Sequence, residues 1–312
     1  MSVLPKTLTA RKHVWVNRLE PGAGMADIVH PALQLASHGY AVAIDPIRGG
    51  RIISATYEGL DVLRPDAGSG AASALDSACF PLVPFSNRIR NGAFAFQGQY
   101  YQLGKNWDGD AHAINGEGWL RPWDVVAADG SRALLRLRGT GWWPWAYECL
   151  QEITVIERGI GLALTLRNID ASPMPAGLDL HPDAMYTDQT MLRFDDTSAS
   201  PPLGPGLLVS QPLGSRYKIW EPTSGIGDRA RSLLCGLARD CYDHPAGDRP
   251  AGFGDLAPGG AQHCVVYKPA DAPYFCVEPV SHLTGAFEAA GPAAAGLEIF
   301  AAWRNIGPRH FH

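Results

Sequence analysis

Two residues in this sequence have side chains that could act as an acid and a base. His181 lies in AGLDLHPDAM, between Asp179 and Asp183, after a strand-like run. Glu278 ends the apolar run YFCVEP, where a carboxylate must be solvated, paired or hydrogen-bonded because bare burial is unfavourable. Such carboxylates are candidates for a tuned general base. His181 alone leaves three interpretations open, namely a catalyst, a metal ligand or a hydrogen-bonded structural residue.

A second set of polar residues could bind a substrate. Asn87 and Arg88 follow a proline-bounded turn in PFSNRIRNGAF, and a guanidinium there could fork onto two hydroxyls or a carboxylate. The alternative is a surface arginine in a loop. In HAINGEGWLRPW, Asn115 could bind sugar hydroxyls while Trp119 and Trp123 pack against the sugar's C–H face. The two tryptophans, like the GWWPWAY cluster, are equally compatible with core packing.

Strands must position these residues, because apolar side chains recur mainly at every second position. GIGLALTLRN alternates in this way, and with YECLQEITVIE before it predicts a long hairpin over residues 147–168. YAVAIDPIRGGRIISATYEGLDVL predicts two further turns, at RGG and EG. Helical spacing is suggested only around RSLLCGLARDCY. Further strands are expected at RALLRLRG, QHCVVYKP, YFCVEPV and GLEIFAAWRN.

The composition favours one large antiparallel fold. The chain has 312 residues, 46% of them apolar, with 35 glycines and 25 prolines punctuating the short strands. An all-β antiparallel sandwich or barrel is the economical architecture. The Pro/Gly-rich stretches RPDAGSGAASALDSA, ASPPLGPGLLVSQPLGS and PAGDRPAGFGDLAPGG are expected to be long loops rather than domain linkers.

Charge and cysteine usage narrow the class of protein. A net charge of −5, with 26 lysines and arginines spread along the chain, argues against a nucleic-acid partner. No signal-peptide core or membrane span is evident, so a cytoplasmic protein without membrane contact is expected. The cysteines include no C-x-x-C pair, and buried, reduced thiols are expected. They are Cys79, Cys149, Cys235, Cys241, Cys264 and Cys276.

Five short motifs in order resemble the aldose 1-epimerase (galactose mutarotase) family. They are GGRI, PFSNRIRNGAF, NGEGWLRPW, GLDLHP and FCVEP, and the resemblance extends from about residue 40 to 305. It implies a single domain over residues 1–312, a galactose mutarotase-like supersandwich that binds a free monosaccharide. It also implies that no cofactor or metal is needed. The chain would be a monomer or homodimer.

The resemblance also implies roles for individual residues. His181 matches the family's general acid, Glu278 its general base, and Asn87 with Arg88 its substrate-binding pair. Interconversion of α and β anomers needs one proton to leave the C1 hydroxyl while another reaches the ring oxygen, so one acid and one base suffice. Asp179 or Asp183 could favour the imidazolium form of the histidine.

The sequence departs from the family pattern at three places. Asn115-Gly116 stands where many members have His-Gly, so that histidine's role is lost or has moved to His112. HPDA replaces HPYF, which puts Asp183 where an aromatic side chain lines the sugar pocket in relatives and suggests an acidic or differently shaped subsite. The substrate-gripping aspartate has only a loose counterpart in LARDCYDH, where Asp240 or Asp243 could serve.

Other functions remain open from the sequence. A non-catalytic sugar-binding or sugar-sensing protein would use the same fold without needing a matched acid and base. A sugar-phosphate epimerase would need Arg88, Arg90 and Arg121 to converge on a phosphate. A glycoside hydrolase would need two carboxylates flanking the bond, such as Glu278 with Asp179 or Asp183. For a metal centre, the sequence offers only the two histidines of the terminal HFH as closely spaced ligands, without an evident third ligand.

Overall fold

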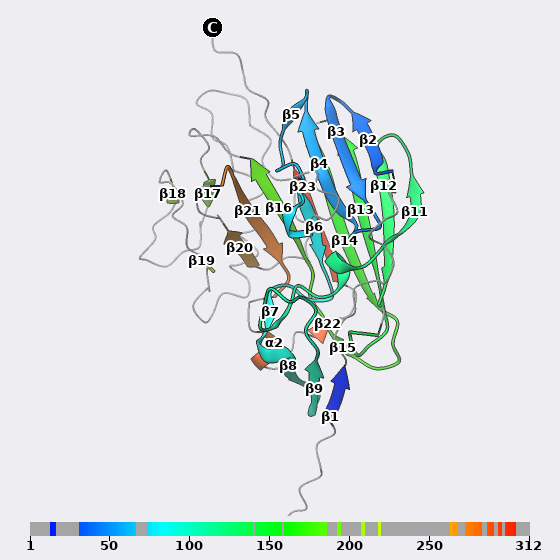
Figure 1. Ribbon diagram of the computed structural model, residues 1–312, viewed down its shortest axis with the longest axis vertical. Coiled ribbons are helices and arrows are strands. Elements are labelled where there is room, and N and C mark those ends of the chain that lie inside the picture. Colours follow the sequence, from blue (N-terminus) through cyan, green and yellow to red (C-terminus); the bar gives the residue numbers. More distant parts are fainter. Residues whose placement is uncertain are drawn as a thin grey trace, which may run out of the picture.

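The protein is built almost entirely of antiparallel strands, as a computed structural model shows (Figure 1). The structure describes residues 13–16, 31–66, 74–139, 141–157, 159–185, 192–194, 207–209, 218–219, 263–267, 272–282, 286–289, 293–294 and 297–303. This confirms the all-β antiparallel sandwich. Within these ranges no helix has the length and apolar character needed to cross a membrane.

One sheet contains the predicted long hairpin. β13 (Tyr147–Ile156) and β14 (Gly159–Asn168) pair antiparallel from Tyr147–Asn168 to Ile156–Gly159. The apolar face of β14 is buried as its alternation predicts, because side chains on a strand point to opposite faces in turn. The sheet order is β11 (Asp124–Ala128), β12 (Arg132–Arg138), β13, β14 and β23 (Leu297–Trp303).

The second sheet is larger and carries the candidate catalytic residues. Its turns at RGG and EG connect strands as the sequence predicts. The order along the sheet is β19 (Lys218–Ile219), β20 (His263–Tyr267), β21 (Tyr274–Val280), β16 (Asp179–Met185), β6 (Cys79–Leu82), β4 (Arg51–Tyr57), β3 (Tyr40–Asp45) and β2 (Leu33–Ser37), with β5 (Leu60–Asp61) beside β4.

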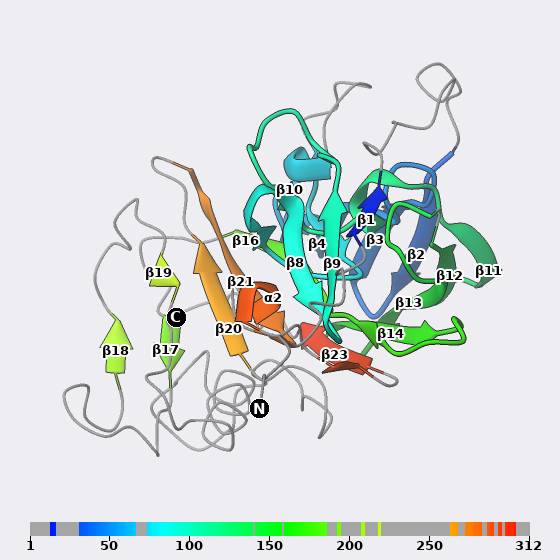
Figure 2. The same ribbon diagram turned by 90° about the horizontal axis from the view of Figure 1, so that it is seen from below.

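The two sheets bury a shared core. β13 lies against β2 and β3 where the two sheets face each other (Figures 1 and 2). Apolar side chains from both sheets form one buried cluster. Val42 and Ile44 of β3 belong to it together with Ile153 of β13 and Leu164 of β14. Burial of each such side chain stabilises the fold by about 1.5–3 kcal/mol, which keeps the strands of the site in a fixed register.

A small sheet lies at one end of the described structure (Figure 1), and an aromatic cluster packs against it. β9 (Gln99–Leu103) pairs with β8 (Ala93–Phe96) and, in parallel, with β1 (His13–Val16). Phe94 stacks on Trp143 with ring centroids 5.4 Å apart, and Phe287 of the short helix α2 (Ala286–Ala289) meets both rings edge-on. The GWWPWAY tryptophans are therefore core residues.

Trp119 and Trp123 are also core residues, which corrects the interpretation that they stack on a sugar. Each residue is 1% exposed. Their indole N–H groups donate to the backbone carbonyls of Gly116 and Gly118, so the polar atoms are satisfied inside the protein. Trp119 lies in the 3₁₀ turn η3 (Gly118–Leu120) and packs near Phe80.

Several short elements complete the described chain. The predicted loop ASPPLGPGLLVSQPLGS contains β18 (Leu207–Val209), which pairs with β17 (Leu192–Phe194). The RSLLCGLARDCY stretch lies outside the described residues. The other short elements are η1 (Ala74–Asp76), β7 (Arg88–Ile89), η2 (Arg90–Gly92), β10 (Ala113–Ile114), β15 (Met174–Pro175) and β22 (Ala293–Ala294).

Candidate active site

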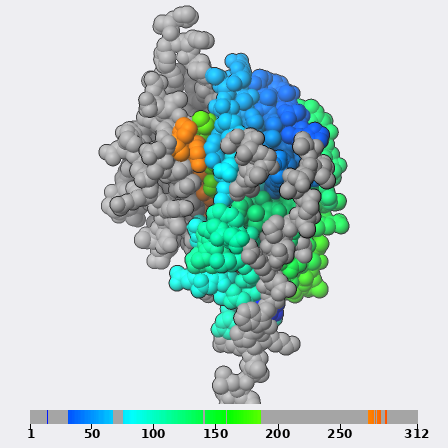
Figure 3. All heavy atoms as spheres, in the orientation of Figure 1, coloured from blue at the N-terminus to red at the C-terminus, as the bar shows by residue number. Residues whose placement is uncertain are grey.

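The candidate site lies where β16 and β21 run side by side. Asp179, His181 and Asp183 occupy alternate positions of β16 and therefore share one face. The register Asp179–Val280 and Asp183–Cys276 sets His181 opposite Glu278. In the space-filling view both strands reach the surface next to one another (Figure 3).

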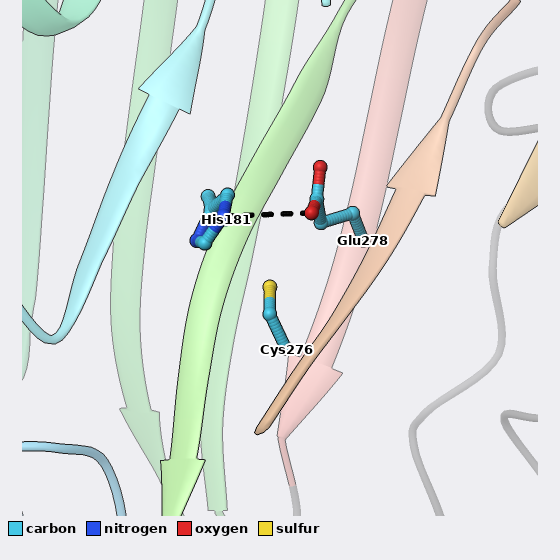
Figure 4. A group of neighbouring side chains, drawn as sticks. All are labelled: His181, Cys276 and Glu278. Atoms are coloured by element: carbon cyan, nitrogen blue, oxygen red, sulfur yellow. Dashed lines mark ion pairs between the residues drawn. The ribbon is translucent and has the colours of Figure 1, made fainter. Parts of the chain in front are cut away.

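His181 and Glu278 face each other across the two strands (Figure 4). Nε2 of His181 lies 3.4 Å from Oε1 of Glu278, with the two side chains 15% and 8% exposed. A nitrogen and a carboxylate at this distance form an ion pair when the imidazole is protonated. The predicted acid and base are therefore brought together, each with limited access to solvent.

The imidazole is held on its other sides as well. Nδ1 of His181 lies 3.1 Å from Oδ1 of Asp183, and the Phe80 ring stacks on the imidazole at 4.6 Å between centroids. Burial disfavours the charged imidazole, but Glu278 and Asp183 outweigh burial and raise the pKa of His181 above its ordinary 6.5. These two carboxyl groups thus favour the protonated form that an acid catalyst needs, relative to a free imidazole.

Asp179 is a second carboxyl group beside Glu278. It is completely buried, it accepts a hydrogen bond from the Ser86 hydroxyl at 3.0 Å, and it lies close enough to Glu278 for the charge of that carboxylate to act on it. Burial first, and then the charge of Glu278, raise the pKa of Asp179 well above its ordinary 3.8. The protonated acid can donate to Glu278, so the two carboxyls need not both be ionised.

This contact bears on the glycoside hydrolase interpretation. The carboxyl pairs of such enzymes stand about 5 Å or more apart, because they flank a glycosidic bond. Asp179 is completely buried, and its raised pKa favours the neutral form. Asp183 faces His181 and an arginine, Arg64. Neither aspartate is placed like the second carboxylate of a glycosidase.

Asn87 and Asn115 are brought together by reciprocal hydrogen bonds. The backbone N–H of Asn87 donates to the side-chain Oδ1 of Asn115 at 2.9 Å. The backbone N–H of Asn115 donates to the backbone carbonyl of Asn87 at 2.9 Å. Both residues have positive φ values, 60° and 58°, which asparagine tolerates better than most residues. We call this pair, Asn87 and Asn115, the asparagine clamp. Asn87 directly follows Ser86, whose hydroxyl donates to Asp179, so the clamp lies near the Asp179 end of β16.

Arg88 lies beside the asparagine clamp with its own acidic partner. Its Nε donates to Oδ2 of Asp110 at 2.7 Å, and the side chain remains 36% exposed. Arg121, another residue considered for phosphate binding, lies 3.6 Å from the buried Glu117 carboxylate. Because both cations already face carboxylates, the geometry does not favour a phosphate site.

The other proposed substrate-binding residues are positioned differently. Nδ1 of His112 accepts a hydrogen bond from the Asn91 amide at 3.1 Å, which ties His112 to the η2 turn. Asp183, expected to line an acidic subsite, is only 1% exposed and turns toward His181 rather than an open subsite. Asp240 and its alternative Asp243 lie outside the described residues.

One group near the acid and base has metal-ligand chemistry. Ligand atoms of His181, Cys276 and Glu278 all lie within 4.8 Å of one another (Figure 4). Burial, followed by Glu278 and the aspartates, raises the pKa of the Cys276 thiol well above its ordinary range, which disfavours the thiolate that a metal requires. His181 and Glu278 already contact each other. The three residues therefore fit a protonated hydrogen-bonding cluster better than a metal site.

The sequence names Asp179 and Asp183 as groups that could act on His181, and the alternation in DLHPD places all three on one face of the strand. Sequence reasoning missed other residues of the site. No comparable signal marked Arg64, Ser86 or Phe80, which come from other strands and loops. His282, whose Nε2 accepts a hydrogen bond from the Ser86 amide at 3.2 Å, was also missed.

Sequence comparisons relate part of the chain to known proteins. Residues 31–183 match the aldose 1-epimerase family model. YphB, an uncharacterized protein of Escherichia coli K12, is 34% identical over 158 residues, which are 50% of this chain and 53% of YphB. YihR, another uncharacterized protein of that organism, is 29% identical over 108 residues, covering 32% and 34% of the two chains. The match therefore spans about half of the first relative and less of the second.

Solved structures share the fold over most of the chain. One from Escherichia coli K12, provisionally named an aldose 1-epimerase, has a TM-score of 0.65 at 21% identity and covers 88% of this chain and 98% of its own. A galactose mutarotase-like protein from Lactobacillus casei has a TM-score of 0.56 at 13% identity, covering 88% and 99%. The GalM/aldose epimerase homologue from C. elegans has a TM-score of 0.57 at 14% identity, covering 88% and 98%. At these identities the likeness shows the fold.

Proposed function

From the resemblance of this chain to the aldose 1-epimerase family, we propose that it interconverts the α and β anomers of a free aldose. The observation that carries the proposal is the contact of His181 with Glu278, an acid and a base facing one another at 3.4 Å on neighbouring strands. A protein that only bound or sensed a sugar would not need such a matched pair. The family match over residues 31–183 supports the same reaction class.

The proposed reaction opens and recloses the sugar ring. Glu278 takes the proton of the C1 hydroxyl while Nε2 of His181 gives a proton to the ring oxygen. The C1–O bond to the ring oxygen breaks, and the hemiacetal becomes an open-chain aldehyde. Rotation about C1–C2 and reversal of the two proton transfers yield the other anomer. No cofactor enters this scheme, and each transfer contributes about 10²–10⁴-fold to the rate.

The surroundings of the pair support the two roles. The raised pKa of His181 favours a protonated acid. A protonated Asp179 that donates to Glu278 would stabilise the carboxylate form of the base. In the proposed complex the sugar hemiacetal replaces the direct contact between His181 and Glu278. Asn87 and Arg88, which follow Ser86 in the chain, would bind hydroxyls of the same sugar.

The proposal is tested by anomer exchange, measured by NMR or polarimetry on a panel of aldoses. Glu278→Gln and His181→Asn should each slow the exchange by about 10²-fold or more, because each removes one proton transfer. Glu148→Gln is the matched control, since Glu148 pairs with Arg138 on the other sheet. No acceleration by the wild type on any aldose, or a Glu278→Gln variant as fast as wild type, would contradict the proposal.

A further inference from the structure

Asp183 contacts the proposed acid from the side opposite the base. Its Oδ1 lies 3.1 Å from Nδ1 of His181, whereas Glu278 lies 3.4 Å from Nε2. The two ring nitrogens of a histidine are distinct, and the partner of one determines which proton the other can offer. The Nδ1 contact is an ion-pair distance without the alignment of a hydrogen bond, and it leaves Nε2 as the nitrogen that faces the base and the substrate.

The backbone of Asp183 is fixed at both of its polar groups. Its amide donates to the Ala78 carbonyl at 2.8 Å, and its carbonyl accepts from the Arg64 amide at 2.8 Å. A bridge between Leu63 and Ala184 runs beside the second bond. Because Asp183 is also 1% exposed, its carboxylate has little freedom to turn toward solvent.

The side chain of Arg64 holds the other carboxylate oxygen. Its Nη2 lies 2.9 Å from Oδ2 of Asp183 and also donates to the Ser77 carbonyl at 3.0 Å. The guanidinium lies over the Tyr274 ring, 4.4 Å from its centroid. A buried carboxylate needs such a partner, because an uncompensated charge in the interior is unfavourable. Arg64 thus balances Asp183 while leaving Oδ1 for His181.

We infer that Asp183, anchored by Arg64, is a positioning residue that directs Nε2 of His181 toward Glu278 and the substrate's ring oxygen. The inference rests on the proposed function for the substrate, but the orientation of the imidazole can be measured without any sugar. Asp183 acts through His181 and does not touch the reacting atoms. Its place in HPDA therefore tunes the acid instead of forming an acidic subsite.

The first test is histidine-labelled nitrogen-15 NMR of the sugar-free protein, with the His181 signals assigned by their loss in His181→Asn. In wild type the neutral imidazole should carry its proton on Nδ1, next to Asp183. In Asp183→Asn the titration midpoint of His181 should fall, because Asp183 is one of the groups that raise its pKa. Asp66→Asn, which removes the carboxylate paired with Arg51, is the matched control and should leave that midpoint unchanged.

The second test is the pH profile of anomer exchange. An acid must be protonated to act, so activity falls as pH rises through the pKa of His181. In Asp183→Asn this fall should come at lower pH. At pH values above the fall of the wild-type profile, kcat should drop about tenfold for every pH unit by which the profile moves, while KM changes much less. A purely structural role would lower activity without moving the profile.

Defined outcomes overturn the inference. A neutral His181 protonated on Nε2 in wild type would overturn it, and that measurement does not depend on the folding of Asp183→Asn. An unchanged His181 midpoint in Asp183→Asn would overturn it as well. An inactive wild type whose His181 titration depends on Asp183 would remove the proposed reaction and leave the positioning pair intact.

Discussion

At the residue scale, the site is a cluster in which each buried charge faces a partner of opposite sign. His181 lies between Glu278 and Asp183, and Asp183 is balanced by Arg64. Asp179 completes the cluster as the carboxyl whose raised pKa favours the neutral form. Such pairing is required because unpaired charges are strongly disfavoured in the interior. This arrangement places a protonated His181 beside an ionised Glu278 while the buried charges of the cluster balance one another.

The neutral form of Asp179 leads to a prediction for an amide at this position. In Asp179→Asn the amide can accept from Ser86 and donate to Glu278, as a protonated aspartic acid does. We expect Tm at mildly basic pH to equal or exceed that of wild type, and anomer exchange to stay within about tenfold. Asp179→Ala should lower the free energy of unfolding by about 1–3 kcal/mol, because both partners lose a hydrogen bond. Thermal denaturation distinguishes the two, and equal losses of stability would count against a neutral Asp179.

At the element scale, prolines shape the pairing of the two strands that carry the acid and base. β16 and β21 pair at Asp179–Val280 and again at Asp183–Cys276. Pro182 and Pro279 lie in the stretch between and lack the amide N–H that a ladder needs. The stretch of β16 and β21 with fewer ladder hydrogen bonds is therefore the one in which His181 faces Glu278. On β16, side chains at every second position supply the histidine and both aspartates.

The turn that contains Asn115 packs closely against the backbone of another segment at Gly116. Gly116 has φ 64° and bridges to Val83, and an added Cβ would meet the Val83 carbonyl and the Pro84 nitrogen. Gly116→Ala should therefore lower the free energy of unfolding by about 2 kcal/mol or more.

The matched control for this turn is Gly98→Ala. Gly98 also has a positive φ, 77°, but its Cβ would meet nothing within 4 Å. Gly98→Ala therefore measures the cost of backbone strain alone, of order 1 kcal/mol, whereas Gly116→Ala adds a steric clash to that cost. Chemical denaturation of both variants measures the difference. Equal losses would show that the approach of Val83 does not constrain the turn.

At the scale of the whole molecule, two titrating groups link the site to stability. The folded-state pKa of His181 lies above its ordinary 6.5, and that of Asp179 lies well above 3.8. A group whose pKa rises on folding stabilises the fold fully below its unfolded pKa, and this stabilisation is lost as pH rises through the folded pKa. Both groups therefore act in the same direction.

The expected result is a Tm that falls as pH rises above about 6.5, where His181 begins to lose its proton in the unfolded chain. Thermal denaturation followed by circular dichroism, at constant ionic strength, measures this slope. Asp179→Asn should remove the part of the pH dependence that begins above the ordinary carboxyl pKa of 3.8, where Asp179 ionises in the unfolded chain. A wild-type Tm that rises with pH through this range would contradict the assigned pKa directions.

The sequence by itself determined the class of fold, because strand alternation is a local property. Period-two runs and Gly/Pro turns predicted the hairpin over 147–168 and the turns at RGG and EG, and the structure confirms them. The motif order also singled out His181 and Glu278, which the structure brings together. Sequence patterns carry this much because side-chain direction along a strand follows from residue count alone.

Only the tertiary structure decided what surrounds those two residues. Arg64, Phe80 and Ser86 reach the site from segments far from it in the chain, and pairing across a sheet brings them there. The same packing buried Trp119 in the core. It also turned Asp183 from an expected pocket residue into a partner of His181. Contacts of this kind depend on register and burial across distant strands, which local patterns do not encode.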